Sequence, residues 1–172
     1  QGEKLALTYG DVCPQVPMGG RSFFFAGPEM PESEQCLNLN IWAPKNDGNK
    51  RAVMVWIHGG GFQSGASNDL HSYDGENLAR TGDVVVVSVN HRLNAMGYPD
   101  LSAYGGPYKD SANVGMQDLV AALEWVKANI DQFGGAPNNV TIFGESGGGA
   151  KVLTLMAMPS AKGLFHKAVV QS

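Results

Sequence analysis

The segment VTIFGESGGG, residues 140–149, decides the fold of this chain. Three of its first four residues are apolar and these four predict a short strand, and the residues after the glycines predict a helix. Between the two lies Gly144-x-Ser146-x-Gly148, the pattern of a nucleophile elbow, in which a sharp strand-to-helix turn lifts a serine hydroxyl out of a sheet. The three-residue pattern alone is weak evidence, but its position between a strand and a helix makes it strong.

Working outward from this segment, apolar strands and amphipathic helices alternate along the chain. The first 36 residues are rich in glycine and proline breakers and are expected to be loop-like. Strands are expected at 37–42, 52–57, 84–89, 140–143 and 168–170, and helices at about 74–80, 113–133 and 147–158. Alternation of this kind predicts an α/β fold with a mainly parallel central sheet.

A second glycine cluster, His58-Gly59-Gly60-Gly61, also follows an apolar strand. It matches the HGGG oxyanion loop, in which the absence of side chains lets backbone N–H groups approach a tetrahedral oxyanion. We assign the donors to Gly60 and Gly61, joined by the N–H of Gly147. Each cluster alone could simply form a tight turn. Both together, at strand ends where α/β sheets carry their sites, indicate acyl-transfer chemistry.

Composition excludes several classes of function. The 172 residues include 12 Lys+Arg and 16 Asp+Glu, for a net charge of −4, which argues against nucleic acid as a partner. No apolar run approaches the ~18 residues of a membrane span. The cysteines and histidines lack the spacing of a zinc site, and we expect neither a metal nor a cofactor. The 23 glycines make up about 13% of the 172 residues, against a usual share of ~7%, so they must have local roles.

A phosphate-binding loop is the main competitor for the second glycine cluster. Gly144 and Gly149 have the spacing of such a loop. That loop, however, requires lysine directly after the last glycine, and then serine or threonine to hold magnesium. Here Lys151 comes one position late and Val152 cannot bind a metal, so nucleotide binding is not supported.

The chain resembles the type-B carboxylesterases of the α/β-hydrolase fold, in particular their bacterial, para-nitrobenzyl-esterase-like members. The matching segments extend over nearly the whole chain and are specific in combination. They are SEQCLNLN at 33–40, VWIHGGGF at 55–62, NHRL at 90–93, NVG at 113–115 and FGGAPNNVTIFGESGGG at 133–149.

The resemblance implies roles for individual residues. Ser146 corresponds to the nucleophile, and Gly60, Gly61 and Gly147 correspond to the oxyanion donors. Glu145 resembles the acidic neighbour that tunes the catalytic histidine electrostatically. The implied activity is hydrolysis of a small-molecule carboxylic ester through an acyl-enzyme.

Two residue pairs have implied structural roles. From the residues alone, Cys13 and Cys36 are as consistent with free thiols as with a bridge, and the resemblance places them at the family's first disulfide. A bridge favours a secreted or periplasmic protein, and free thiols favour a cytoplasmic one. Arg92 and Asp118 resemble a structural ion pair of the family.

The chain departs from the family pattern at several positions. Gln35 replaces a usual acid and His91 a common tyrosine. Gly147 replaces the usual alanine, which we expect to leave a backbone donor unaffected. The three tryptophans lie outside the segment between Cys13 and Cys36, so choline esters are not supported. An apolar run, Phe23–Phe25, is consistent with either an entrance to the site or core packing.

The catalytic triad cannot be completed in its usual order of Ser, then Asp or Glu, then His. The 26 residues after Ser146 contain no acid, and their one histidine, His166, has the surroundings of a surface residue. We therefore expect residues 1–172 to be the N-terminal, nucleophile-bearing part of a larger α/β-hydrolase domain. The triad acid and histidine would come from its remaining segments. The competing hypothesis is an esterase-like binding or adhesion protein without catalysis.

Overall fold

A strand of branched apolar residues forms the interior of the sheet. β3 (Val85–Val89) is buried at every position, as expected for a strand covered on both faces. The computed structural model describes residues 6–16, 30–45 and 47–172, so the Phe23–Phe25 run lies outside the described residues. The remaining strands of the sheet are β1 (Leu39–Trp42), β2 (Arg51–Ile57), β4 (Gly135–Glu145) and β5 (Lys167–Gln171).

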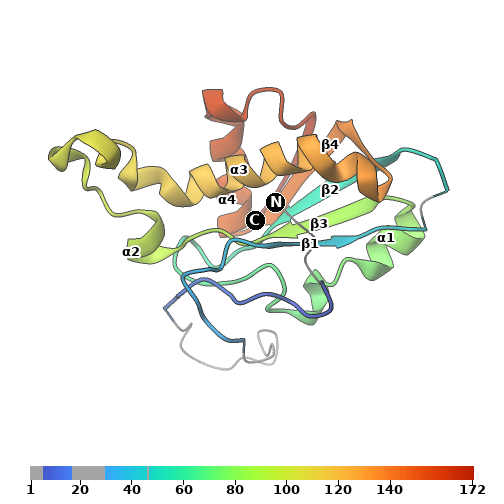
Figure 1. Cartoon of the computed structure of the whole chain (residues 1–172), viewed down its shortest axis with the longest axis horizontal. Helices are drawn as coiled ribbons and strands as arrows, with labels where there is room; N and C mark the ends of the chain where they lie inside the picture. The colour runs from blue at the N-terminus through green and yellow to red at the C-terminus, as the bar shows by residue number, and fades with distance from the viewer. Residues whose placement is uncertain (1–5, 17–29, 46) are drawn as a thin grey trace.

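The five strands lie in the order β1-β3-β2-β4-β5 (Figure 1). β1 pairs antiparallel with β3, and the other three pairs are parallel. The predicted, mainly parallel sheet is therefore confirmed. Its central strand is β2, whose neighbours β3 and β4 follow much later in the chain.

Helices cover both faces of the sheet. The α-helices are α1 (Glu76–Gly82), α2 (Asn94–Gly97), α3 (Val114–Asn129) and α4 (Gly147–Ala157). Short 3-10 helices occupy η2 (His71–Tyr73), η3 (Ser102–Tyr104), η4 (Gly106–Tyr108), η5 (Ser111–Asn113), η6 (Ile130–Phe133) and η7 (Pro159–Ala161). None of the helices in the described part of the chain is long and apolar enough to span a bilayer.

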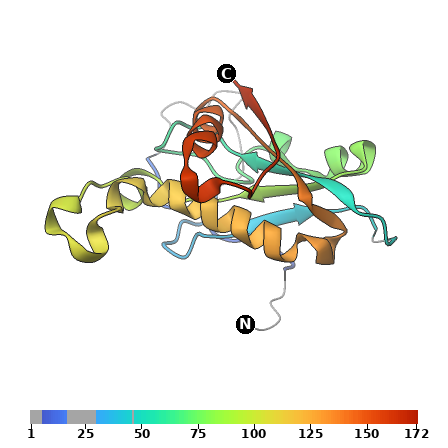
Figure 2. The ribbon, with the colours of Figure 1, turned by 90° about the horizontal axis from the view of Figure 1, so that it is seen from above.

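Alternation along β3 shows which helix covers which face. Val85, Val87 and Val89 belong to the main core cluster, together with apolar residues of α3 and α4. Val86 points to the opposite face, where it lies with Trp42 against the start of α1 at Gly75. Figure 1 accordingly shows α3 across the front of the sheet, and Figure 2 shows α1 on the other side.

The predicted elements are present, with differences at their ends. β4 begins at Gly135 instead of Val140, because its first residues pair with the start of β2 across a register shift between Arg51 and Val53. The helix expected at 113–133 is α3 followed by the tighter turn η6, which ends at Gly134 with φ +78°. The short helices between Asn94 and Asn113 were not predicted.

The N-terminal loops are tied to the sheet by a disulfide. Cys13 and Cys36, 23 positions apart, are bonded and buried together with Leu93. The disulfide implied by the resemblance is therefore present. Closing a loop of this length is worth about 3 kcal/mol in the loop-entropy treatment.

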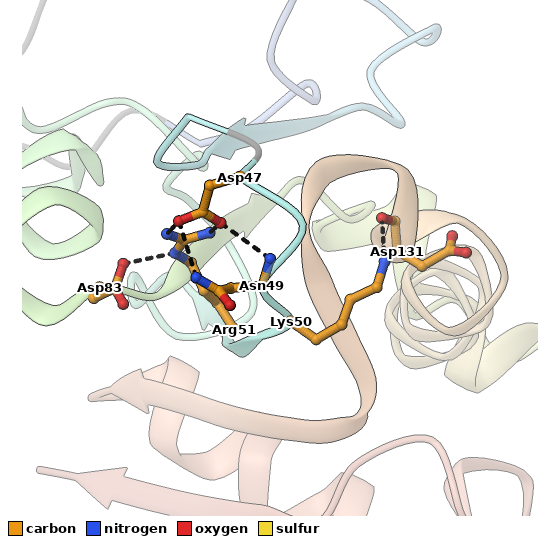
Figure 3. Close-up of polar contacts among 6 residues, drawn as sticks. All are labelled: Asp47, Asn49, Lys50, Arg51, Asp83 and Asp131. Atoms are coloured by element: carbon orange, nitrogen blue, oxygen red, sulfur yellow. Dashed lines mark hydrogen bonds and ion pairs between the residues drawn. The ribbon is translucent and has the colours of Figure 1, made fainter.

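A charged cluster holds the amino end of β2 (Figure 3). Arg51 donates two hydrogen bonds of 2.9 Å to Asp47 and one of 2.6 Å to Asp83, which follows α1. Hydrogen bonds from the Arg51 guanidinium hold the pKa of Asp47 well below its usual range. Beside it, Lys50 Nζ donates to the carbonyl of Asp131 in η6, at 2.9 Å. The amino end of β2 is thus bonded to the end of α1 on one face of the sheet and to η6, which follows α3, on the other.

The predicted ion pair between Arg92 and Asp118 is also present. The Arg92 side chain donates to both carboxylate oxygens, at 2.9 and 2.6 Å, and its backbone N–H adds a third bond of 2.9 Å. The Asp118 side chain is only 5% exposed, while that of Arg92 is 34% exposed. The pair joins the segment after β3 to α3.

The start of α4 lies unusually close to the carboxyl end of β2. A Cβ atom at Gly148 would overlap the carbonyl oxygen of Ile57 and lie 2.9 Å from that of His58. A Cβ atom at Gly144 would lie 2.6 Å from the carbonyl carbon of Gly148. Only glycine fits these two positions without moving backbone, which explains the spacing of the elbow pattern.

We predict that Asp118→Asn destabilises the full-length protein. The amide cannot accept from both guanidinium nitrogens, so the free energy of unfolding should fall by about 1–2 kcal/mol, less than for a fully buried pair because Arg92 is partly exposed. Urea unfolding measures the change. The control is Asp110→Asn, whose pair with Lys109 is 3.9 Å long and exposed, and it should change stability by less than about 0.5 kcal/mol. Equal effects would contradict the prediction.

We also predict that Gly148→Ala lowers the free energy of unfolding by about 1–3 kcal/mol, because the methyl group forces α4 away from β2. Gly82→Ala is the matched control, since Gly82 is also helical but its added Cβ would meet no atom closer than 3.5 Å. That variant should stay within about 0.5 kcal/mol of the parent protein. Thermal or urea unfolding separates the two, and a neutral Gly148→Ala would show that the close approach is not rigid.

Candidate active site

The parallel pairing of β2 with β4 brings the two glycine clusters together. Ile57, the last residue of β2, is opposite Gly144, and each strand then enters its glycine loop. A Cβ atom at Gly59 would lie 3.0 Å from the carbonyl oxygen of Glu145 and 3.4 Å from Ser146 Cβ. The predicted oxyanion loop therefore lies directly against the predicted nucleophile elbow.

Ser146 occupies the strained turn that the elbow pattern predicts. Its φ of 55° and ψ of −122° lie outside the usual regions for a residue with a side chain. Two hydrogen bonds hold the turn: Ser146 N donates to Gln171 O at 3.0 Å, and Ala150 N donates to Ser146 O at 3.1 Å. Ser146 is exposed and directly precedes α4, whose amino end favours negative charge.

Each carbonyl group of the glycine loop accepts a hydrogen bond, and these bonds orient the N–H groups of the loop. Gly60 O accepts from Gln63 N at 3.3 Å and Ser64 N at 3.2 Å. Because C=O and N–H point in opposite directions in a trans peptide, the N–H of Gly61 points away from these donors. His58 Nδ1 lies 2.9 Å from Gly59 O and must donate to it, so the N–H of Gly60 points away from the ring.

The two amides of this loop are available for a ligand. Among the described residues, the N–H groups of Gly60 and Gly61 have no hydrogen-bond partner. The N–H of Gly147 belongs to the first residue of α4, where a helix leaves its amides without internal partners. All three predicted donors therefore lie at the same edge of the sheet as Ser146.

The expectation that glycine at position 147 leaves the backbone donor unaffected stays a prediction, but the structure leaves no room for a side chain there. A Cβ atom there would overlap the carbonyl oxygen of Gly61 and lie 2.6 Å from its nitrogen. The amide would still exist, but the loop would have to move away to make room for the methyl group. The close contact between loop and elbow thus depends on the glycine.

None of the described histidines forms a hydrogen bond with Ser146. His71 is exposed in η2. His58 is fully buried, and burial together with the nearby Lys151 charge lowers its pKa to about 3. His91 stacks on it at 4.6 Å between ring centroids and also has a pKa well below the usual value because of burial. His166 Nδ1 accepts a hydrogen bond from Val140 N at 3.1 Å, far back along β4. A histidine base for Ser146 is not among these residues.

Glu145 precedes the nucleophile position and is exposed. Its Oε2 atom would lie 3.4 Å from a Cβ at Gly59, so its carboxylate borders the glycine loop. Burial, with added repulsion from Asp69 and Glu145, raises the pKa of Tyr73 to about 12. The suggested influence of Glu145 on a catalytic histidine stays a prediction.

Lys151 is a site residue that the sequence reasoning missed. The sequence indicates for it only an incomplete match to a phosphate-binding loop, yet it is completely buried, and its Nζ donates to Gly61 O at 2.6 Å and His58 O at 3.2 Å. The available signal was its spacing, because positions four apart share a helix face and Lys151 is four residues after Gly147.

A hollow in the described surface adjoins the glycine loop but does not include Ser146. Its volume is about 810 Å³, and Phe62, Asn94, Tyr98 and Met116 are among its lining residues. Phe62 meets Tyr98 edge to face at 5.2 Å between ring centroids. In the described part of the chain, no three His, Cys, Asp or Glu side chains cluster in a way that could hold a metal ion.

Comparison with known proteins gives a consistent result. The sequence model of the carboxylesterase family matches residues 1–172. The para-nitrobenzyl esterase of Bacillus subtilis (strain 168) is 48% identical over 168 residues, which cover 97% of this chain and 33% of that protein. The phenmedipham hydrolase of Pseudarthrobacter oxydans is 41% identical over 172 residues, covering 99% of this chain and 33% of that protein.

Solved structures agree with this comparison. An esterase from the anaerobe Clostridium hathewayi, described as able to hydrolyse aliphatic aromatic polyesters, superposes with a TM-score of 0.89 at 55% identity. The match covers 94% of this chain and 33% of that one. The chain thus spans about a third of the length of these relatives. From the family match and the structural likeness together, this chain belongs to the carboxylesterase family and has its α/β-hydrolase fold.

Proposed function

We propose that the protein carrying this chain hydrolyses small-molecule carboxylic esters, with Ser146 as the nucleophile. The observation that carries the proposal is the pairing of Ile57 with Gly144, which places a loop of free amides against a strained, exposed serine. Nucleophile and oxyanion donors have to lie about 3 Å from one reacting group, and adjacent parallel strand ends can meet that condition. Membership of the carboxylesterase family supports the same reaction class.

In the proposed reaction, Ser146 Oγ attacks the ester carbonyl and its proton passes to a histidine outside this chain. The carbonyl oxygen becomes an oxyanion, which accepts hydrogen bonds from the N–H groups of Gly60, Gly61 and Gly147. Collapse of this intermediate breaks the ester bond, and the leaving alcohol takes the proton from the histidine. Water then attacks the acyl-enzyme by the same route and releases the acid.

The environment of the site favours an anionic intermediate. The donors are backbone groups whose carbonyls are already fixed, so little reorganisation is required when charge develops. The amino end of the eleven-residue helix α4 adds a partial positive charge directly after Ser146. Loss of one donor in such a site typically raises the barrier by about 2.7–4 kcal/mol.

The partners in this proposal are the ester and the remaining segments of the same protein. Those segments would supply the acid and histidine of the triad, since none of the described histidines forms a hydrogen bond with Ser146. The mechanism uses neither cofactor nor metal, and the net charge of −4 gives nucleic acid no attraction. The disulfide between Cys13 and Cys36 favours an oxidising compartment, so we propose a secreted or periplasmic protein.

Labelling with a fluorophosphonate probe tests the proposal. We expect the full-length protein to take up one equivalent of probe, detected by intact mass, and Ser146→Ala to take up none. Hydrolysis of a p-nitrophenyl ester should fall at least about 1000-fold in Ser146→Ala, since the nucleophile cannot be replaced.

The matched control is Ser160→Ala, which removes another exposed serine, just beyond α4. It should label and hydrolyse like the parent protein. A folded full-length protein that neither labels nor cleaves the ester would overturn the proposal and support a binding protein instead.

A further inference from the structure

Lys151 is buried in α4 with its ammonium group against the glycine loop. Its relative exposure is 0%, and its Nζ lies 2.6 Å from Gly61 O and 3.2 Å from His58 O. The ammonium also lies 5.1 Å from the centroid of the Phe62 ring, within the range of a cation–π contact. Two carbonyls and one aromatic face thus match the three donors of an ammonium group.

Such a residue is unusual because buried charges normally have a partner of opposite sign. Among the described residues, Lys151 forms no ion pair, and burial is the only influence on its lowered pKa, which is about 8. The elements packed against α4 are β2, β4, β5 and α3. Their acidic residues, Glu145 on β4 and Asp118 and Glu124 on α3, do not contribute to the pKa of Lys151. The titratable groups that face it are His58 and His91, and burial keeps both of them neutral.

The two carbonyls that Lys151 binds enclose the peptides that carry the predicted donors. The His58 carbonyl comes directly before Gly59, and the Gly61 carbonyl ends the glycine run. Between them lie the peptide groups that contain the N–H of Gly60 and of Gly61. Because these peptides are planar, fixing both flanking carbonyls restricts the direction of both amides.

The conformational freedom of the glycine segment makes this restriction of the two amides necessary. Gly60 and Gly61 have φ values of +80° and +63°, and a Cβ at Gly61 would meet no atom within 4 Å. A segment of three glycines has large conformational freedom, and side-chain packing cannot hold it in place. Hydrogen bonds to its carbonyls therefore have to define its shape.

We propose that Lys151 is a positioning residue for the oxyanion hole: it clamps the carbonyls of His58 and Gly61, and its uncompensated positive charge favours the oxyanion. This inference rests on the proposed esterase function and deepens it. The clamp acts through the amides of Gly60 and Gly61, whereas the charge acts on the intermediate through space. Its effect should therefore appear in the transition state more than in substrate binding.

Lys151→Met in the full-length protein removes both the donors and the charge while nearly keeping the volume. We expect kcat for a p-nitrophenyl ester to fall about 10–100-fold, with KM changed less than about threefold, as for loss of one oxyanion interaction. Lys151→Gln keeps an amide donor without charge, and its kcat should lie between those of the parent protein and Lys151→Met. Melting temperatures of all variants are measured alongside.

The control is Lys50→Met, because Lys50 also donates to a backbone carbonyl, that of Asp131, but at the surface and at the opposite end of β2 (Figure 3). Its kcat should equal that of the parent protein. A folded Lys151→Met with unchanged kcat would overturn the clamp, even if fluorophosphonate still labels Ser146. A parent protein that is not labelled at Ser146 would overturn the proposed function itself, so the two failures are distinguishable.

The pH profile of kcat provides a readout that a purely structural role would not move. Because burial lowers the pKa of Lys151 to about 8, the ammonium loses its proton as the pH rises through that value. We expect kcat of the parent protein to decline above about pH 8 and the decline to be absent in Lys151→Met. If the substituted proteins do not fold, the parent protein alone decides, and a flat profile up to pH 9.5 would overturn the role of the charge.

Discussion

The parallel pairing of β2 with β4 is the constraint on which the rest of the structure depends. With Ile57 opposite Gly144, the two strands end at the same edge of the sheet, and each enters its glycine loop there. The chain after β4 has to turn back as α4 without striking the end of β2, and the bare backbone of Gly148 allows this. The fold and the candidate site are therefore set by the same few backbone contacts.

The ends of β2 are stabilised in different ways. At its amino end, Arg51 joins Asp47 and Asp83 in an exposed charged cluster, and Lys50 reaches the turn after α3. At its carboxyl end, the glycine loop is held by bonds between peptide groups and by the side chains of His58, Ser64 and Lys151. Of the carboxylates in this region, Glu145 borders the loop, whereas Asp47 and Asp83 lie at the far end of β2.

Local pattern predicted most of the elements, because valine-rich runs such as Val85–Val89 have few alternatives to a buried strand. The elbow at Ser146 was predictable for the same reason, since its motif and its setting are contiguous in sequence. The early start of β4 at Gly135 was not, because it depends on pairing with Arg51, over 80 positions away in the chain. The tight fit of Gly147 against Gly61 and the burial of Lys151 likewise depend on the distance between two loops, which no local pattern encodes.

The positions of the described histidines relative to Ser146 have a consequence for the proposed catalysis. The three amides, the carbonyl contacts that orient them and the nucleophile all lie within residues 58–64 and 146–151. In contrast, His58 and His91 are buried with lowered pKa values, and His166 is bound to backbone. His71 is exposed, and among the described residues no histidine forms a hydrogen bond with Ser146. In the proposed reaction the base therefore comes from another part of the protein. In the proposed reaction, the described residues would organise oxyanion stabilisation separately from the base. Because an oxyanion hole retains part of the rate enhancement when the other catalytic groups are lost, the two contributions can in principle be separated kinetically.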